Sequence, residues 1–204
     1  MVDVRLYVEG GGDSKALHRR CAQGFNAFLE KAGFKGRMPR IVACGGRQAA
    51  YDRFRTACEQ NVRALLLIDS EEPVQTDSPW QHLANRPGDG FVAPRNATDV
   101  HCHFMVVVME SWFLADKAAL SDYFGQGFRA SALPQNTDIE AIAKKDLYAR
   151  LRQATANCKT KAPYGKGAHS FQILLRIAPD KVRDASPWAR RFLDKLSALM
   201  DQSD

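Results

Sequence analysis

The sequence lacks any apolar run long enough to cross a bilayer, which takes roughly 20 residues. Its apolar runs are short, as Met105–Met109 illustrates, and Met1–Asp3 does not begin like a secretory signal. Cysteine is scarce, since the five cysteines are odd in number, widely scattered and without a CxxC pair. These absences disfavour a membrane span, a disulfide scaffold and a zinc finger. We therefore expect a cytoplasmic protein with free thiols.

Several enzyme motifs are absent as well. No GxxxxGK[ST] phosphate loop occurs, and a GxGxxG motif fails at Lys15, which stands where the third glycine is needed. The GxSxG motif of serine hydrolases is also missing. His101 and His103 could face a zinc ion together, but further ligands at diagnostic spacing are lacking. Phosphate-loop, dinucleotide-binding and serine-hydrolase chemistries are therefore disfavoured.

Charge is distributed unevenly along the 204 residues, whose formal net charge is +6. Residues 144–195 hold 13 Lys and Arg against 4 Asp and Glu, whereas the rest of the chain holds 16 against 19. A basic C-terminal segment suits the binding of a polyanion, and an acidic N-terminal segment suits a metal. A solvated helical surface would carry the same excess, so charge alone leaves both interpretations open.

Short apolar segments alternate with helical patterns in the first half of the chain. The predicted strands run over Val4–Val8, Arg40–Cys44, Ala64–Ile68 and Phe104–Met109. Between them, apolar residues recur at helical spacing, which predicts connecting helices. Strands that are apolar on both faces and alternate with helices indicate a parallel sheet between helix layers. We therefore predict an α/β fold with a mostly parallel, four-stranded, Rossmann-like sheet.

The remaining chain is predicted to be loop and then helix. Residues 72–99 are rich in Pro, Asp, Asn and Gly, which predicts a long loop with at most a short helix around Trp80–Ala84. Strand patterns stop after Asp116, and Ser186-Pro187 caps and opens a last helix. We predict an α/β core over residues 1–116 and a helical, basic subdomain over residues 117–204, packed on that core.

Acidic residues stand where three of the predicted strands end. Glu9 ends the first, Asp69 and Glu71 end the third, and Glu110 ends the fourth. The carboxyl ends of parallel strands meet at one edge of a sheet, and Asp69 and Glu71 share a face while the backbone is extended. Carboxylate oxygens favour Mg²⁺ or Mn²⁺ over zinc. We predict that these four acids bind a metal, with capping of helix N-termini as the alternative use of such residues.

A basic segment in the last third is the candidate for holding phosphates. Its lysines surround an aromatic residue, which suits contact with a nucleic-acid backbone and stacking of a base. The predicted nucleic-acid-binding residues are Lys144, Lys145, Lys159, Lys161, Tyr164, Lys166 and His169. Trp112, Trp188 and Phe192 recur instead among apolar neighbours at helical spacing and are predicted to be core.

Two sets of motifs resemble known families. The segment Leu6-Tyr-Val-Glu9-Gly10-Gly-Gly-Asp13, followed by Asp69-x-Glu71, is similar to the TOPRIM domain of topoisomerases, primases and overcoming-lysogeny-defect nucleases, where the second motif is Asp-x-Asp. The whole layout resembles the bacterial TOPRIM-like family called domain of unknown function 4276. The pieces that carry this resemblance are Glu110-Ser-Trp112-Phe-Leu-Ala-Asp116, Lys144-Lys145, Tyr164-Gly-Lys166 and the Ser186-Pro-Trp188 helix.

The resemblance implies roles for some of these residues. Glu9 matches the TOPRIM glutamate, a general base or metal ligand, and Asp69 and Glu71 match the metal-binding acids. It leaves the roles of three nearby acids open, namely Asp13, Glu72 and Asp116. Members of the family are often encoded beside ABC-type ATPases in anti-phage defence loci, which implies a nuclease effector with an ATPase partner.

The function predicted from these features is a Mg²⁺- or Mn²⁺-dependent nuclease that cleaves DNA or RNA with Glu9, Asp69 and Glu71 as catalytic residues. The resemblance adds antiviral defence with an ABC-type ATPase. One alternative is a non-catalytic TOPRIM-like module that binds nucleic acid or a nucleotide and regulates the ATPase. Another is action on a free nucleotide or on the protein-synthesis machinery.

Overall fold

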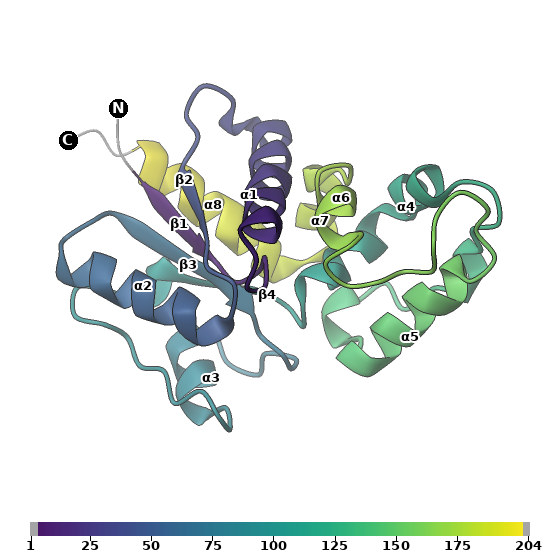
Figure 1. Ribbon diagram of the computed structural model, residues 1–204. Helices are drawn as coiled ribbons and strands as arrows, with labels where there is room; N and C mark the ends of the chain where they lie inside the picture. Colours follow the sequence, from purple (N-terminus) through teal and green to yellow (C-terminus); the bar gives the residue numbers. More distant parts are fainter. Residues whose placement is uncertain (1–3, 202–204) are drawn as a thin grey trace.

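Four parallel strands form the sheet on which the rest of the molecule is built (Figure 1). The computed structural model describes residues 4–201, so Met1–Asp3, used in the prediction on secretion, lies outside the described residues. The strands are β1 (Arg5–Val8), β2 (Arg40–Ala43), β3 (Ala64–Asp69) and β4 (Cys102–Met105). Their order is β2-β1-β3-β4 with every pair parallel, which confirms the predicted α/β fold.

Helices connect the strands and make up the C-terminal part of the chain. The α-helices are α1 (Lys15–Leu29), α2 (Arg47–Glu59), α3 (Pro79–Asn85), α4 (Lys117–Phe124), α5 (Lys144–Thr155), α6 (Ser170–Leu174), α7 (Pro179–Ala185) and α8 (Pro187–Asp201). A π-helical segment, η1 (Glu30–Phe34), extends α1. The 3₁₀ helices are η2 (Asp99–His101), η3 (Met109–Asp116), η4 (Ala130–Ala132) and η5 (Ile139–Ala141).

Different helices cover the two faces of the sheet. Val8 of β1 lies in one apolar cluster with Phe25 of α1 and Phe192 of α8. Its neighbour Tyr7 lies in a second cluster, with Phe54 of α2 and residues of α3. Successive residues of a strand point to opposite faces, so a strand buried on both sides is apolar at every position. The result is a sheet between two helix layers.

Local signals set the ends of several helices. Ser14 Oγ accepts the backbone amide of Leu17 at 3.1 Å and so caps α1. At the start of α8, Ser186 Oγ accepts the amide of Ala189, two residues beyond Pro187, at 3.0 Å. Gly33 has a φ of 95°, which interrupts the helical run after α1. The predicted start of the last helix at Ser186 therefore agrees with the structure.

The fourth strand lies earlier in the chain than the sequence pattern predicts. The pattern predicts a strand over Phe104–Met109, whereas β4 begins earlier, at Cys102, and already ends at Met105. Past β4, the carbonyl of Val107 accepts the amide of Glu71 at 2.8 Å, and the amide of Met109 donates to Asp69 Oδ1 at 2.8 Å. This stretch is buried beside the sheet without continuing the strand. The prediction is wrong there because burial alone produces the same apolar pattern.

The C-terminal helices divide into an outlying group and a helix of the sheet. Helices α4 to α7 gather beside the sheet, at the right of Figure 1, whereas α8 returns to it. Leu196 of α8 is buried in the cluster that α1 also lines, and α8 packs against β4. Residues 117–201 contain no strand in the part of the chain that is described, as predicted. Within residues 4–201, none of the helices combines the length and apolarity that a membrane crossing needs.

The contact between α8 and β4 contains a buried histidine. His103 Nδ1 lies 2.9 Å from a guanidinium nitrogen of Arg191, and His103 Nε2 lies 3.0 Å from the carbonyl oxygen of Val100. A guanidinium can only donate, so Nδ1 accepts and Nε2 donates. His101 Nδ1 accepts the amide of Thr98 at 3.0 Å. Both histidines are engaged in hydrogen bonds of the fold, which argues against a zinc pair.

Acid is expected to destabilise the fold through His103. Burial, aided by the charge of Arg191, lowers the pKa of His103 to about 3. The unfolded chain takes up a proton near pH 6.5, whereas the folded protein stays neutral until far lower pH. The contribution of His103 to the free energy of unfolding is complete above about pH 6.5 and falls by about 1.4 kcal/mol per pH unit as the pH drops below that value.

Denaturant titrations between pH 7 and pH 4 measure this slope. We expect His103→Gln, which removes the titrating ring, to flatten the fall in the free energy of unfolding relative to the wild type. An unchanged slope in the variant would contradict the assignment.

Candidate metal centre

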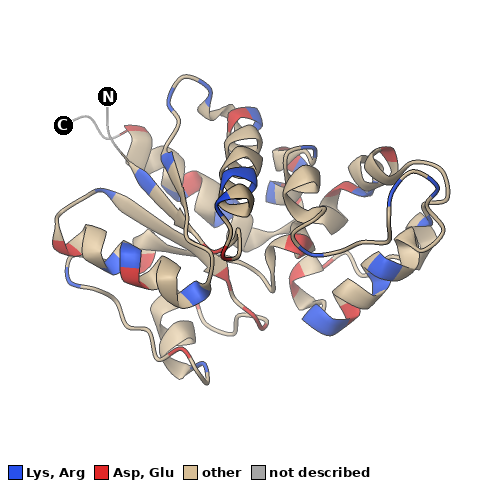
Figure 2. Ribbon diagram, viewed as in Figure 1, with Lys and Arg blue, Asp and Glu red and all other residues tan. Residues whose placement is uncertain are grey.

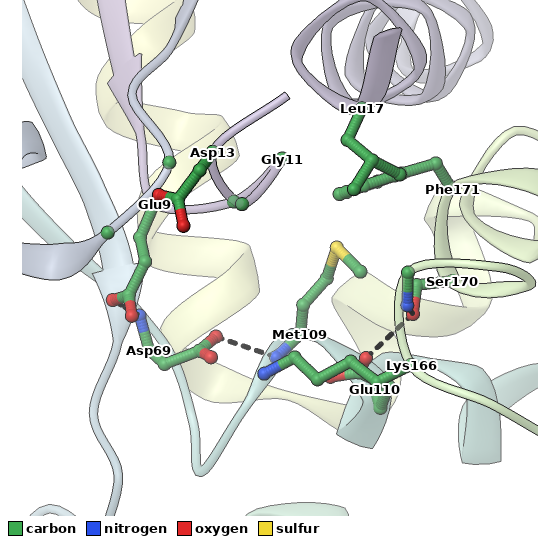
Figure 3. Close-up of a pocket in the computed structure, with 15 residues that line it drawn as sticks. Glu9, Gly11, Asp13, Leu17, Asp69, Met109, Glu110, Lys166, Ser170 and Phe171 are labelled. Carbon is green, nitrogen blue, oxygen red and sulfur yellow. Dashed lines mark hydrogen bonds between the residues drawn. The ribbon is translucent and has the colours of Figure 1, made fainter. Parts of the chain in front are cut away.

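Three carboxylates meet at the carboxyl edge of the sheet. Glu9 follows β1, Asp69 ends β3, and these two strands are neighbours. Glu9 Oε2 accepts the backbone amide of Asp69 at 3.1 Å, and Figure 3 shows the two side chains together. With Glu71, each residue offers one carboxylate oxygen, and these oxygens all lie within 4.8 Å of one another. The structure thus brings together three of the four predicted metal ligands.

Glu71 reaches the centre by a different route from the one the sequence predicts. The prediction relied on an extended backbone that places Asp69 and Glu71 on one face. In the structure β3 ends at Asp69, and Glu71 has a φ of 68°, in the left-handed region. Its amide is held by the carbonyl of Val107. The reasoning from alternation is therefore wrong, although the side chain still joins the cluster.

Burial disfavours the charged form of the carboxylates at this centre. Asp69 is 5% exposed, and burial, followed by the charges of Glu9 and Glu110, raises its pKa well above the usual range. The pKa of Glu9 is raised mainly by burial, although the charge of Arg47 counteracts this. Crowded carboxylates of this kind are stabilised by a bound cation or by cationic side chains.

Arg47 is the residue that sequence reasoning missed. From the start of α2, its guanidinium donates to the carbonyl oxygen of Asp69 and lies 3.3 Å from Glu9 Oε2. Two further nitrogens bind the carboxylate of Asp89 at 2.8 and 2.7 Å. The signal in the sequence is its place directly after Gly45-Gly46, at the end of a strand that meets the same edge of the sheet.

Glu110 belongs to a separate hydrogen-bonded cluster. Its side chain is fully buried, and its Oε1 accepts the hydroxyls of Tyr164 and Ser170, both at 2.9 Å. Its Oε2 accepts the hydroxyl of Tyr148 at 3.0 Å. Burial and the charge of Glu110 raise the pKa of both tyrosines, which keeps them protonated donors. Glu110, the fourth predicted metal ligand, is therefore held by these hydroxyl groups and is not part of the cluster of Glu9, Asp69 and Glu71.

Two lysines from the helical part of the chain reach the acids. Lys144, at the start of α5, forms an ion pair with Glu71. Lys166 lines the same pocket as Glu9 and Asp69 (Figure 3). Partial burial alone would lower the pKa of Lys166, but the charge of Glu110, with those of the other acids, raises it above its ordinary value. Lys166 therefore carries a full positive charge beside the carboxylates.

The other predicted nucleic-acid-binding residues are not gathered at one place. Lys145 and Lys159 are exposed, and the Lys161 ammonium lies 4.7 Å from the ring centre of Tyr123. Tyr164 is 3% exposed, packs against Tyr148 and His169 and is not among the residues that line the pocket, which contradicts the prediction that its ring stacks on a base. His169 accepts the amide of Gly165 at 3.0 Å and packs against Phe124, which makes it part of the loop's own structure. Figure 2 shows the basic residues of α5 in blue and the acids near the strand ends in red.

The three acids whose roles were open have different surroundings. Asp13 lines the pocket, whereas Glu72 is exposed on the loop after β3. Asp116 accepts the backbone amide of Ala178 at 3.0 Å and the ammonium of Lys181 at 2.7 Å. Burial would raise the pKa of Asp116, but these hydrogen bonds lower it below the usual value. Asp116 therefore links η3 to α7 and has a structural role.

The family comparison agrees with the motifs. A family model described as "Domain of unknown function (DUF4276)" matches residues 8–197. This match confirms that the chain belongs to the DUF4276 family, the second of the two families that its motifs resemble. No curated protein and no solved structure matches the chain.

Removing the guanidinium of Arg47 is expected to destabilise the folded protein. The variant Arg47→Met keeps the length of the stem but removes the cation that Glu9 and Asp89 share, and it leaves Asp89 paired with Arg86 alone. Loss of one partner of a buried ion pair typically costs about 3–5 kcal/mol. We expect a decrease of about 3 kcal/mol or more in the free energy of unfolding.

The matched control is Arg55→Met on the same helix, where the side chain is 48% exposed and pairs with Asp52. Exposed pairs of this kind contribute less than about 1 kcal/mol. Equal losses of stability in the two variants, measured by denaturant unfolding, would show that Arg47 does not hold the centre together.

Proposed function

We propose that this member of the DUF4276 family is a Mg²⁺- or Mn²⁺-dependent nuclease that hydrolyses phosphodiester bonds in DNA or RNA. The observation that carries the proposal is the convergence of three carboxylate oxygens, from Glu9, Asp69 and Glu71, within 4.8 Å at the edge of a pocket. The resemblance of these residues to the acids of TOPRIM domains supports the same assignment.

The donor set fits a hard divalent cation. All three side chains offer oxygen, which suits Mg²⁺ or Mn²⁺ and not zinc. Oxygens on opposite sides of Mg²⁺ lie about 4.2 Å apart, from its bond length of about 2.1 Å, so a spread of 4.8 Å requires a small contraction or a bridging water. Mg²⁺ usually keeps several waters. Burial is the main cause of the raised pKa of Glu9 and of Asp69, and a bound cation would favour the charged form of both carboxylates.

The bound cation would polarise the scissile phosphate and lower the pKa of a coordinated water. The chain's own groups have separate tasks. Asp69 and Glu71 hold their carboxylates at the centre, and Glu9 is the candidate to accept a proton from the attacking water. Lys166, fixed in charge by the surrounding acids, binds the phosphate and neutralises charge that develops on it. Arg47 fixes the orientation of Glu9.

A non-catalytic, regulatory role is the second candidate, and one observation favours it. Arg47 and Lys144 form ion pairs with Glu9 and Glu71, so cationic side chains already neutralise two of the three carboxylates in the absence of a metal. In that case the chain would bind nucleic acid or a nucleotide and regulate an ATPase. A role in antiviral defence with an ABC-type ATPase, as the family resemblance implies, is compatible with either candidate.

The first test removes one charge from the centre. Asp69→Asn keeps the side-chain volume, and its amide oxygen can still accept the amide of Met109. We expect cleavage of labelled DNA or RNA in Mg²⁺ or Mn²⁺ to fall to the level seen with a chelator. Thermal stability should stay equal or rise, because the substitution removes repulsion with Glu9.

The control is Asp122→Asn, which alters an exposed acid on α4. It should cleave like the wild type. Full cleavage by verified pure Asp69→Asn would rule out the proposed nuclease mechanism, and a wild type that binds but never cleaves would favour the regulatory role.

The second test separates phosphate binding from metal binding. Lys166→Ala should weaken nucleic-acid binding for every sequence and reduce the slope of log affinity against log salt by about one unit. Glu9→Gln should do the reverse, lowering metal affinity while leaving nucleic-acid binding intact, since it removes a negative charge that faces the polyanion.

Both variants are measured by fluorescence anisotropy in Ca²⁺ and by calorimetric titration with Mn²⁺. Unchanged affinity and salt slope in Lys166→Ala would show that this lysine does not contact the substrate.

A further inference from the structure

The metal centre opens onto a cavity of about 400 Å³ that has two chemically different sides. Glu9 and Asp69 form the acidic side. Leu17 of α1, Met109 at the start of η3 and Phe171 of α6 form an apolar side, and Figure 3 shows the side chain of Met109 pointing toward those of Leu17 and Phe171. An acidic cluster that binds only a metal needs no apolar wall beside it. The apolar side therefore indicates a part of the ligand that is not phosphate.

Glycines leave the space beside Phe171 open. Gly10 has a φ of 143°, and a Cβ built on it would lie 3.6 Å from two ring atoms of Phe171 and 3.2 Å from Cys21 Sγ. The ring therefore lies next to bare backbone immediately after Glu9. Gly45 pairs with Gly10 through two backbone hydrogen bonds of 2.9 Å and has a φ of 77°, and a Cβ there would lie 2.5 Å from the carbonyl oxygen of Gly12. A side chain at Gly45 would therefore clash with backbone, and one at Gly10 would crowd Cys21 and contact the ring of Phe171.

We infer that this cavity receives one unstacked nucleobase of the nucleic-acid substrate, whose phosphate lies at the three carboxylates; the inference rests on the proposed function and specifies its substrate. An aromatic ring and two flexible apolar side chains together suit the faces of a flat heterocycle such as a base. The acids and Lys166 lie beside the same opening, as the linkage of a base to its phosphate requires.

The size of the cavity favours single-stranded substrate. Pockets for small ligands span about 300–1,000 Å³, and this one lies near the lower limit. It has room for one nucleotide unit and not for a stacked run of base pairs. A base in a duplex must leave its stack to enter such a pocket, which costs free energy that a single strand does not spend. We therefore expect unpaired ends, gaps and single strands to bind more tightly than intact duplex.

The binding experiment uses the full-length protein in Ca²⁺ and, in parallel, in a chelator. The probes are a short single strand carrying one 2-aminopurine, the same strand with an abasic site in its place, and the corresponding duplex. We expect the 2-aminopurine fluorescence to change on binding, and the abasic strand and the duplex to bind about tenfold more weakly, which is the typical effect of one stacking contact. Competition by a free nucleoside monophosphate distinguishes a pocket for free nucleotides from one for a strand.

Two variants test the apolar wall. Phe171→Leu keeps apolar volume and removes the aromatic face, and it should weaken the single strand about tenfold while leaving the abasic strand unaffected. Leu17→Trp, at a half-buried position, should fill the opening and abolish the fluorescence change. Neither variant alters a carboxylate, so Mn²⁺ affinity measured by calorimetry should stay at the wild-type value. Phe128→Leu, a partly buried phenylalanine that stacks on Phe124 away from the pocket, is the matched control.

The outcomes separate this inference from the proposed function. Equal affinity for the normal and abasic strands, or unchanged binding by both Phe171→Leu and Leu17→Trp, overturns the base pocket even if the protein cleaves nucleic acid in Mg²⁺. Base-dependent binding without cleavage supports the pocket and contradicts the nuclease proposal. Free nucleotide that binds without competition from a single strand overturns the assignment to a nucleic-acid strand.

Discussion

The parallel pairing of β1 with β3 is the constraint on which the centre depends. Val8 lies opposite Leu67 in this register, so Glu9, one residue further along β1, and Asp69, two residues further along β3, emerge at the same edge of the sheet. The Asp69 amide donates to Glu9, which locks the two acids together at the end of the ladder. Two buried carboxylates in this position repel each other, and the surrounding structure has to supply positive charge.

That charge comes from three separate segments of the chain. Arg47 extends from the start of α2, Lys144 from the start of α5, and Lys166 from the loop before α6. Only Arg47 belongs to an element of the α/β sandwich itself. The two lysines tie the outlying helices to the strand ends through opposite charge. The centre is therefore formed jointly by the sheet and by the helical group of α4 to α7.

Glu110 provides a second, buried contact between the sheet and the outlying helices. It is fully buried at the start of η3, and hydroxyls from α5, from the loop before α6 and from α6 itself converge on its two oxygens. A buried carboxylate is tolerated only when its hydrogen bonds are satisfied, so these donors fix how the helices sit against the sheet. Lys166 and two residues of the apolar wall, Met109 and Phe171, are carried by the same segments. The hydrogen bonds that these hydroxyls donate to Glu110 thus help to set the geometry of the pocket.

The sequence by itself determined the parts that rest on local pattern. Continuous apolar strands such as Ala64–Ile68 predict a parallel sheet, Ser186 before Pro187 predicts a helix start, and acids directly after strands predict a cluster at one edge. The tertiary structure decided the rest, because pairing between distant residues leaves no local pattern. The sequence does not reveal the role of Arg47, because its three partners lie far from it along the chain. The prediction that Tyr164 stacks on a base fails for a similar reason: an aromatic residue in a basic loop gives the same sequence pattern whether it contacts a ligand or is buried against Glu110. The end of β4 could not be predicted for a related reason: burial, and not strand pairing, makes residues 106–109 apolar.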